Sequence, residues 1–339
     1  MLIMTAMYPT AENPAFGSFV RTQAESLKRA GIGVEVFALQ GSNRKLIYPR
    51  GVLQLQRLLK WGLFDLVHAH YGFVGMVART QWKVPVVVTY HGDDLLGTVI
   101  GEGKKASWSP LVVAAGKKLA QYVDAAIVQT TEMASKLTKS SVFVIPHEVD
   151  FDLFCPTDRL EARAILGLKA DKKYLLFAAD PEIPVKRFPL AKTVADWLSK
   201  RDTSIELLVV SRETQSRLAL YMSACDVLVF PSYQEGSPNV VKQAMACNLP
   251  IVATDVGDIR QTIGKTKWCY VCNPSVSEFA ARITEVVSPP RRADGRENIR
   301  HLDSSTVSER IIDVYEHVLR NRKRRLERRT RRDVVIAAK

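Results

Sequence analysis

Short apolar segments rich in β-branched residues alternate along this chain with amphipathic segments of helical period. This alternation is typical of β-α-β units, in which a helix returns the chain to a parallel strand beside the previous one. In the first half, strands are predicted near 1–7, 33–38, 65–69, 84–90, 125–129 and 142–146, and helices near 18–30, 52–60, 109–121 and 131–138. The pattern therefore predicts an α/β fold with mainly parallel sheets.

The same alternation starts again after a short segment, 150–156. Strands are predicted there near 173–179, 205–210, 226–230 and 250–253, and helices near 188–200, 214–223, 239–247 and 276–287. A chain of 339 residues also exceeds the size at which one hydrophobic core usually stops growing. We therefore expect two domains, with ligands bound in the crevice between the carboxyl ends of two parallel sheets.

The expected boundaries are an N-terminal domain over 1–155, a C-terminal domain over 156–303, a last helix over 304–319 and a basic tail over 320–339. The last helix is predicted to open with a capping box made by Thr306 and Glu309.

The most informative segment, QEGSPNVVKQAMA, follows the predicted strand 226–230. Ser237 suits an N-cap and Pro238 the first helical position, so a helix is predicted to begin at the carboxyl end of a strand. The unpaired amide groups of a helix start attract anions, and Glu235 stands just ahead to accept hydrogen bonds from hydroxyls. Phosphates and sugar hydroxyls match both features.

These residues carry a resemblance to a known family. The segment EGSPNVVKQAMACNLPIVATDVGD resembles the Glu-x7-Glu donor-site motif of glycosyltransferase family 4, and the segments MYPTAENPAFGSFVRTQAESL, DLVHAHYG, VVVTYHGDD, IPHEVDFDLF and ACDVLVFPS resemble its other conserved loops. The resemblance implies the GT-B fold, in which two Rossmann-like doubly wound domains face a central cleft. It also implies retaining transfer of a hexosyl unit from a nucleotide diphosphate-sugar to a hydroxyl acceptor, without cofactor or metal.

The resemblance implies that Glu235 binds the hydroxyls of the donor sugar. The amides of Gly236, Ser237, Asn239 and Val240, together with Pro238, are expected to meet sugar and phosphate. The second Glu of the motif is Gln243 here, whose amide accepts hydrogen bonds only through its single oxygen. Ribose binding is therefore expected to differ from that of the family.

The family also places an Arg and a Lys where they neutralise the diphosphate leaving group. Lys186 occupies the lysine position, whereas Pro181 stands where the arginine would be. Arg187 is adjacent and is either a substitute cation or a surface residue, since a developing diphosphate charge needs fixed cations.

In the first half, Gly17 and Ser18 precede a helix, where backbone can approach a phosphate closely. His91 follows a predicted strand, at a position whose family counterpart lies beside the donor sugar. Glu235, Lys186 and His91 are accordingly the expected catalytic residues.

Other polar residues are given structural roles. His68 and His70 share one face of a strand and are expected to pack rather than bind metal. Asp93, Asp94 and the acids 150 and 152 are expected to cap and turn the chain. His147 and Glu148 replace the Asn-Gly of the family's interdomain motif, which removes a residue free to adopt positive φ.

The net charge of +13 is concentrated in the segment 320–332, RNRKRRLERRTRR, which carries nine Lys or Arg and one Glu. Such a segment is usually solvated and weakly ordered, but it also attracts anionic surfaces. With no secretory signal or membrane-spanning segment predicted, we expect a cytoplasmic protein, peripheral on the inner membrane face, acting on a glycan or lipid-linked acceptor. Nucleic acid is the less favoured partner.

Three other functions stay open at this stage. A GT-B nucleotide-sugar epimerase would share the architecture but hydrolyse its donor. A catalytically weakened nucleotide-sugar-binding protein is suggested by Gln243 and by the missing arginine. A nucleic-acid-binding protein is suggested by the basic tail alone.

Overall fold

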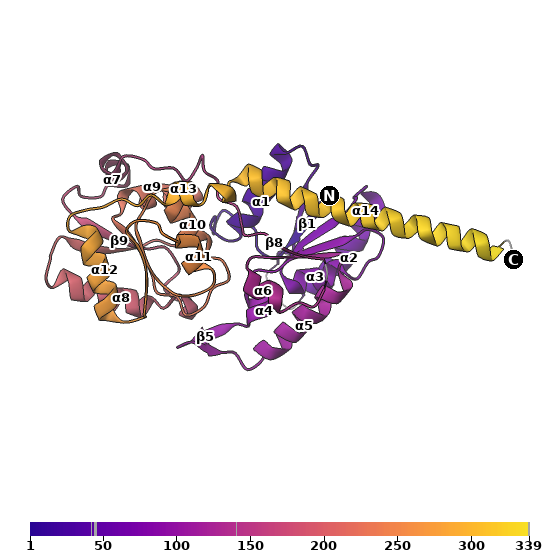
Figure 1. The fold of residues 1–339 in the computed structure, drawn as a ribbon, viewed down its shortest axis with the longest axis horizontal. Helices are drawn as coiled ribbons and strands as arrows, with labels where there is room; N and C mark the ends of the chain where they lie inside the picture. Colours follow the sequence, from indigo (N-terminus) through magenta and orange to yellow (C-terminus); the bar gives the residue numbers. More distant parts are fainter. Residues whose placement is uncertain (42, 44–45, 140, 338–339) are drawn as a thin grey trace.

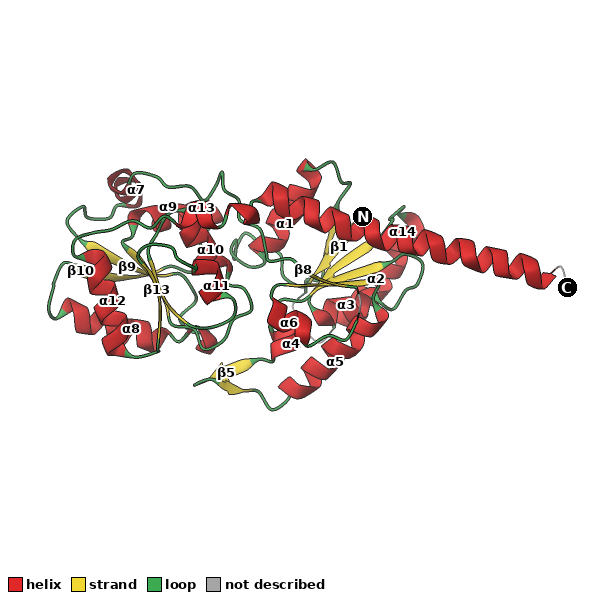
Figure 2. Ribbon diagram, in the orientation of Figure 1, coloured by secondary structure: helices red, strands yellow, loops and turns green. Residues whose placement is uncertain are grey.

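The computed structural model describes residues 1–339 apart from 42, 44–45, 140 and 338–339, and for 329–337 it describes the backbone only. The chain forms two lobes, each built around a parallel sheet with helices on both faces (Figure 1, Figure 2). This is the α/β architecture that the alternating pattern predicts.

The first lobe holds a six-stranded parallel sheet in the order β2-β1-β3-β4-β7-β8. The strands are β1 Leu2–Thr5, β2 Glu35–Ala38, β3 Val67–His70, β4 Val86–Thr89, β7 Ala125–Val128 and β8 Val142–Val144. The helices are α1 Ser18–Arg29, α2 Ile47–Trp61, α3 Gly72–Ala78, α4 Asp93–Leu96, α5 Ser109–Tyr122 and α6 Thr131–Ser135. The central strands are buried along their whole length, as helices on both faces require.

The second lobe holds a five-stranded parallel sheet in the order β10-β9-β11-β12-β13. The strands are β9 Lys173–Phe177, β10 Ile205–Val209, β11 Val227–Phe230, β12 Ile251–Thr254 and β13 Cys269–Cys272. The helices are α7 Arg159–Leu166, α8 Phe188–Ser199, α9 Gln215–Ala224, α10 Asn239–Ala246, α11 Ile259–Ile263, α12 Val276–Val287 and α13 Gly295–Asn298, with short 3-10 helices at Pro184–Lys186 and Arg300–Leu302.

A small antiparallel hairpin, β5 Val99–Gly101 and β6 Lys104–Lys105, projects from the first lobe (Figure 2). The sequence pattern gives no sign of it, nor of α3, whose sequence GFVGMVA contains two glycines. Glycine lowers helix propensity, so α3 depends on its packing within the lobe.

The last helix, α14 Ser304–Ala337, leaves the second lobe, crosses the first and projects beyond it (Figure 1). The helix begins at Ser304, the expected start. The expected capping box is wrong, because the residue ahead of the helix is Asp303 and not Thr306, and the Asp303 carboxylate accepts the amide proton of Ser305 at 3.0 Å. The helix also continues through the basic segment instead of ending near 319, since Arg, Lys and Glu are good helix formers.

An apolar stripe of α14 is buried against the first lobe, in one core cluster with Ile3, Val20 and Val87. We expect Ile311→Ala to lower the free energy of unfolding by about 2–5 kcal/mol, because Ile311 is 1% exposed and its loss leaves a cavity. Leu111→Ala, at a side chain that is 75% exposed on α5, should cost less than about 0.5 kcal/mol. Denaturant unfolding measures both, and equal small effects would contradict the packing of α14 on this lobe.

Candidate active site

A cleft of about 380 Å³ lies where the carboxyl ends of the two parallel sheets face each other. The first lobe contributes residues of α1 and of the loops after β3, β4 and β7, together with His147 of the interdomain segment 145–154. The second lobe contributes residues of the loops after β9 and β11 and of the helices α9 and α10. The predicted residues that line it are Ser18, His91, Lys186, Glu235, Gly236, Ser237, Pro238, Asn239, Val240 and Gln243. Gly17 and Arg187 do not line it.

The helix α10 begins in this cleft without a side-chain cap. Its first residue is Asn239 and its N-cap position is Pro238, one residue later than the sequence predicts. Ser237 does not cap the helix, because its hydroxyl donates a hydrogen bond to Asp258 Oδ2 at 2.6 Å. The first turn of α10 therefore leaves amide groups for an anion in the cleft.

Glu235 and Lys186, 49 positions apart in the chain, form an ion pair across the cleft wall. The ammonium Nζ of Lys186 donates to Oε1 of Glu235 at 2.7 Å, and both side chains are largely buried. Asp93, at the start of α4, lies close enough for both charges to influence its pKa, which burial raises. The two residues expected to bind the sugar and the diphosphate thus lie together.

The backbones of the two lobes approach each other at Gly236. A Cβ on Gly236 would lie 3.1 Å from the carbonyl oxygen of His91 and 3.6 Å from the Cα of Gly92. Gly257 has φ +59°, and a Cβ there would lie 2.2 Å from the carbonyl oxygen of Gly236. Glycine is required at 257, whereas a side chain at 236 would need the backbone of the first lobe to move by a few tenths of an ångström. The loop ahead of α10 lies between these two contacts.

A buried lysine that the sequence reasoning did not single out supports this loop. Lys242 is 1% exposed, and its ammonium donates to the carbonyl oxygen of His147 and to the hydroxyl of Ser237, each at 3.2 Å. Burial lowers the pKa of Lys242 to about 8, against the opposing effects of Asp258 and Glu148. Its charged neighbours, Asp258 and Glu148, lie 16 and 94 positions away in the sequence, so the local pattern gave no signal of this role.

Four histidines form a stacked row from the first sheet to the interdomain segment. His68 contacts the Tyr315 hydroxyl of α14 at 2.7 Å and stacks on His70. His70 Nδ1 lies 3.2 Å from His91 Nε2, and His91 Nδ1 lies 2.9 Å from His147 Nε2. Burial lowers the pKa of every imidazole in the row, that of His70 to about 3. The row is neutral at physiological pH.

The row fixes the tautomers of its members. His70 Nε2 is buried without a hydrogen-bond partner, and an unprotonated nitrogen there costs less than an orphaned N–H group. His70 therefore donates from Nδ1 to His91, and His91 donates from Nδ1 to His147. The imidazole of His91 is held in one orientation at the cleft wall.

The remaining predicted residues lie as follows. Gly17 has φ 69° at the start of α1, where a Cβ would lie 2.2 Å from the carbonyl oxygen of Met7, so glycine shapes the loop beside the cleft. The guanidinium of Arg187 lies 4.4 Å from the ring centroid of Tyr233, outside the cleft lining. Gln243 donates from Nε2 to the side chain of Gln215 at 2.9 Å.

Two of the four acidic residues expected to cap and turn the chain, Asp94 and Asp150, do so. The Asp94 carboxylate accepts the amide protons of His91, Gly92 and Gly72 at 3.2 Å, and burial raises its pKa to about 6. Asp150 likewise accepts the amide protons of Asp152 at 3.1 Å and of Leu153 at 3.0 Å. Among the described residues, no group of three or more His, Cys, Asp or Glu side chains is placed to hold a metal ion.

The interdomain segment is tied to both lobes. Buried Glu148 accepts from Ser26 of α1 at 3.4 Å, and burial raises its pKa to about 7. The amide of Val149 donates to Leu302 ahead of α14 at 2.9 Å. His147 and Glu148 thus replace a flexible Asn-Gly pair with side chains that are buried and bonded.

Two family models match the chain. Residues 19–151 match a model described as "Glycosyl transferase 4-like domain", and residues 190–288 match one described as "Glycosyl transferases group 1". The two matches fall on the two lobes, one on each side of the cleft.

Known proteins resemble the chain in sequence and in fold. The D-inositol 3-phosphate glycosyltransferase of Mycolicibacterium smegmatis is 29% identical over 75% of this chain and 67% of its own, and that of Mycobacterium leprae is 30% identical over 62% and 58%. The matched regions thus cover 58% to 67% of the length of these two relatives. Sucrose-phosphate synthase from Thermosynechococcus elongatus has a TM-score of 0.74 at 20% identity, with 94% and 99% of the two chains covered. Anabaena HepE in complex with UDP has a TM-score of 0.65 at 16% identity, with 93% and 99% covered.

The neutral histidine row should make stability depend on pH. Below pH 6.5 the unfolded chain binds a proton on residue 70, whereas the folded protein does not until about pH 3, so stability is lost as pH falls through this window. His70→Gln removes this effect, while Glu148 and Asp94 titrate in both proteins. We expect the difference in unfolding free energy between wild type and variant to shrink by up to about 1.4 kcal/mol per pH unit below 6.5. Urea unfolding at several pH values measures it, and a constant difference would contradict a neutral His70.

Proposed function

Because this chain belongs to the glycosyltransferases with the GT-B fold, we propose that it transfers a hexosyl unit from a nucleotide diphosphate-sugar to a hydroxyl acceptor, with retention of the anomeric configuration. The observation that carries the proposal is the cleft itself. There the ion pair of Lys186 and Glu235 lies in one cavity with the uncapped start of α10. A cation, a carboxylate and free amides suit a ligand that carries both phosphates and hydroxyls.

Stabilisation of the leaving group falls to Lys186 and to the amides of α10. As the bond between sugar and diphosphate breaks, negative charge grows on the phosphate oxygens, and fixed positive groups in a partly closed cleft lower its energy without reorganising. Arg187 is left out of this assignment, because its guanidinium stacks on Tyr233. The mechanism we propose requires no metal ion.

Orientation of the sugar falls to Glu235 and His91. Donor binding would separate the ion pair of Glu235 and Lys186, so that the carboxylate accepts from sugar hydroxyls while the ammonium meets the diphosphate. His91 is held by His70 and His147 in a single neutral tautomer, so its ring enters the reaction with little orientational freedom to lose.

A second cavity favours the proposal that the acceptor is anionic. It has a volume of about 470 Å³, shares Glu235 with the donor cleft, and is lined by Lys105, Lys117 and Lys136. Of these three cations, Lys136 is paired with Glu132, which also lines the cavity. The two sequence relatives described above are, by name, glycosyltransferases of a phosphorylated inositol. A phosphorylated acceptor, such as a lipid-linked saccharide or other cell-surface glycan precursor, agrees with both observations.

The proposal places the protein in the cytoplasm, peripheral on the inner face of the membrane where such acceptors reside. None of the helices that the structure describes has the length and apolar character needed to cross a bilayer. The segment 320–332 supplies the charge for attraction to an anionic surface. No observation favours the epimerase or the catalytically weakened binding protein.

Glu235→Ala should lower turnover of a nucleotide-sugar donor by at least about tenfold, the scale of one lost hydrogen bond in the transition state. Glu182→Ala, at an exposed carboxylate in the loop after β9, is the matched control and should leave turnover unchanged. Steady-state kinetics with a soluble acceptor measure both variants. Full activity in Glu235→Ala would refute the role of this carboxylate.

Lys186→Ala should weaken nucleotide diphosphate binding by roughly tenfold to a hundredfold, because a hydrogen bond to a charged group is lost. Lys192→Ala removes an exposed lysine of α8 that pairs with Asp196 and should leave the affinity unchanged. Thermal-shift titration with UDP, GDP and their sugars measures the affinities and also ranks the bases, since a ligand of the folded state raises its stability. Equal dissociation constants for Lys186→Ala and wild type would remove Lys186 from the site.

A further inference from the structure

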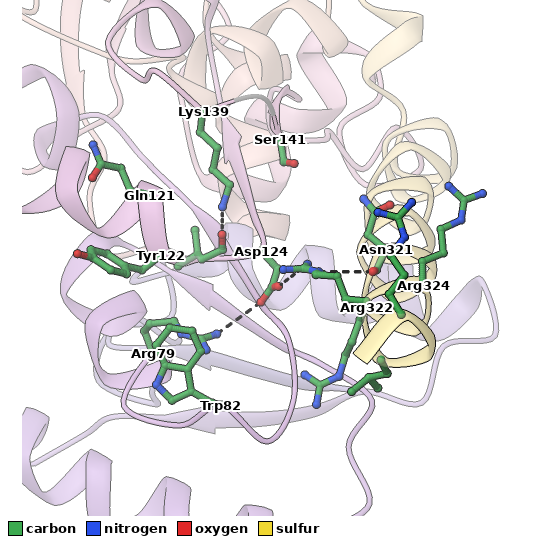
Figure 3. Close-up of a pocket in the computed structure, with 14 residues that line it drawn as sticks. Arg79, Trp82, Gln121, Tyr122, Asp124, Lys139, Ser141, Asn321, Arg322 and Arg324 are labelled. Carbon is green, nitrogen blue, oxygen red and sulfur yellow. Dashed lines mark hydrogen bonds and ion pairs between the residues drawn. The ribbon is translucent and has the colours of Figure 1, made fainter. Parts of the chain in front are cut away.

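Another cavity, of about 740 Å³, lies between α14 and the first lobe (Figure 3). Its walls come from the segments just before β4, β7 and β8 and from residues 321–328 of α14. Because parallel strands begin at one edge of a sheet and end at the other, this cavity lies at the opposite edge of the first sheet from the donor cleft. We call it the basic pocket.

The basic pocket has a large excess of positive charge. Asp124 is the only acidic residue among the described residues that line it, and its carboxylate already accepts from the amide of Val86, from Arg79 at 3.4 Å and from Arg325 at 3.1 Å. The cationic residues that line it are Arg79, Lys139, Arg322, Arg324, Arg325 and Arg328. One carboxylate cannot neutralise them.

The positively charged side chains of the pocket repel one another. Burial lowers the pKa of Arg79, and Arg322 and Arg325 lower it further against the effect of Asp124. The pKa of Lys139 is lowered in the same way, by burial and then by Arg325 and Arg79. Arg79 Nε is also buried without a hydrogen-bond partner. An anion in the pocket would relieve this repulsion and supply the missing acceptors.

The rim of the pocket is apolar and aromatic. Trp82, Tyr122 and Leu326 line it and are 68%, 50% and 53% exposed. Trp61 and Leu63, which precede β3 at the same edge of the sheet, are 81% and 102% exposed. Aromatic and aliphatic side chains interleaved with cations are typical of a surface that sits at the boundary between lipid headgroups and acyl chains.

We infer that the basic pocket binds the phosphate of an anionic lipid headgroup, and that α14 and this edge of the first sheet dock the protein on an anionic bilayer. The inference narrows the attraction of the segment 320–332 to a defined site, and it does not depend on the proposed transfer reaction. Arg322 faces the pocket from α14, Arg79 and Lys139 face it from the lobe, and the Trp82 ring, 3.4 Å from the Arg79 guanidinium carbon, forms its edge (Figure 3). Arg325 of α14 also lines the pocket, where it donates to Asp124 at 3.1 Å.

A matched pair of charge variants tests the site. Flotation of the full chain with phosphatidylcholine vesicles, with and without phosphatidic acid, gives the vesicle affinity. Arg322→Gln with Arg325→Gln should lower affinity for the phosphatidic acid vesicles by roughly tenfold or more. Arg320→Gln with Lys323→Gln removes the same charge from the same helix outside the pocket and should cost less than about threefold. Equal losses in the two variants would overturn the pocket in favour of diffuse attraction.

A charge-neutral pair tests the rim. Trp82→Ala should weaken vesicle binding severalfold while the net charge stays the same. Trp197→Ala removes another exposed ring that stacks on an arginine, Arg201 at 3.5 Å in the second lobe, and should leave vesicle binding unchanged. Undiminished binding of Trp82→Ala would overturn the docking orientation.

Three further measurements separate this site from the donor cleft and identify its ligand. Turnover with a soluble acceptor should be the same in Arg322→Gln/Arg325→Gln as in wild type, which separates this site from the donor cleft. Inorganic phosphate binding that depends on Arg322 and Arg325, without preference for phosphatidic acid over phosphatidylcholine vesicles, would overturn the lipid as ligand. Tighter binding to duplex DNA than to the anionic vesicles would also overturn it.

Discussion

The donor cleft depends on one buried ammonium group. Lys242 joins α10 to the interdomain segment through the carbonyl oxygen of His147, and it holds the hydroxyl of Ser237, which in turn is committed to Asp258. Burying a charge is costly unless it is paired and hydrogen-bonded, and here those bonds fix the loop ahead of α10 between two glycine contacts. The free amides at the start of α10 owe their position to this arrangement.

The histidine row extends this rigidity from the cleft to α14. The ring of His147 accepts a hydrogen bond from His91, and its backbone carbonyl oxygen accepts one from the ammonium of Lys242. At the other end of the row, the ring of His68 forms a hydrogen bond with the hydroxyl of Tyr315 on α14. The helix that follows the second lobe in the chain therefore supplies a hydrogen-bond partner to the buried histidines of the first lobe. Because each imidazole is neutral, the row restricts the orientation of His91 without placing charge at the cleft wall.

Except for β13, three of whose four residues are only partly buried, the alternation of strands and helices was sufficient to predict every strand of the two large sheets, because strands buried on both faces are rich in apolar residues. It also brought Glu235, Lys186 and His91 to one cleft, since each follows a strand and parallel strands end at one edge. Contacts between distant segments could not be predicted in this way. Ser237 was expected to cap α10 because local preference favours it, but Asp258, 21 positions later, takes its hydroxyl. The roles of Lys242 and His147 depend on similar long-range contacts.

The first sheet presents different chemistry at its two edges. The loops after its strands carry His91 and His147 and meet the loop ahead of α10, whereas the segments before its strands, together with α14, carry the cations and aromatic rings of the basic pocket. Strands of four residues separate the edges by roughly 13 Å of backbone alone. A protein docked by the basic pocket would hold its cleft away from the bilayer. A hydroxyl close to the lipid would not reach that cleft, whereas a saccharide that extends from its lipid carrier would, and this geometry favours an acceptor already elongated by earlier sugars.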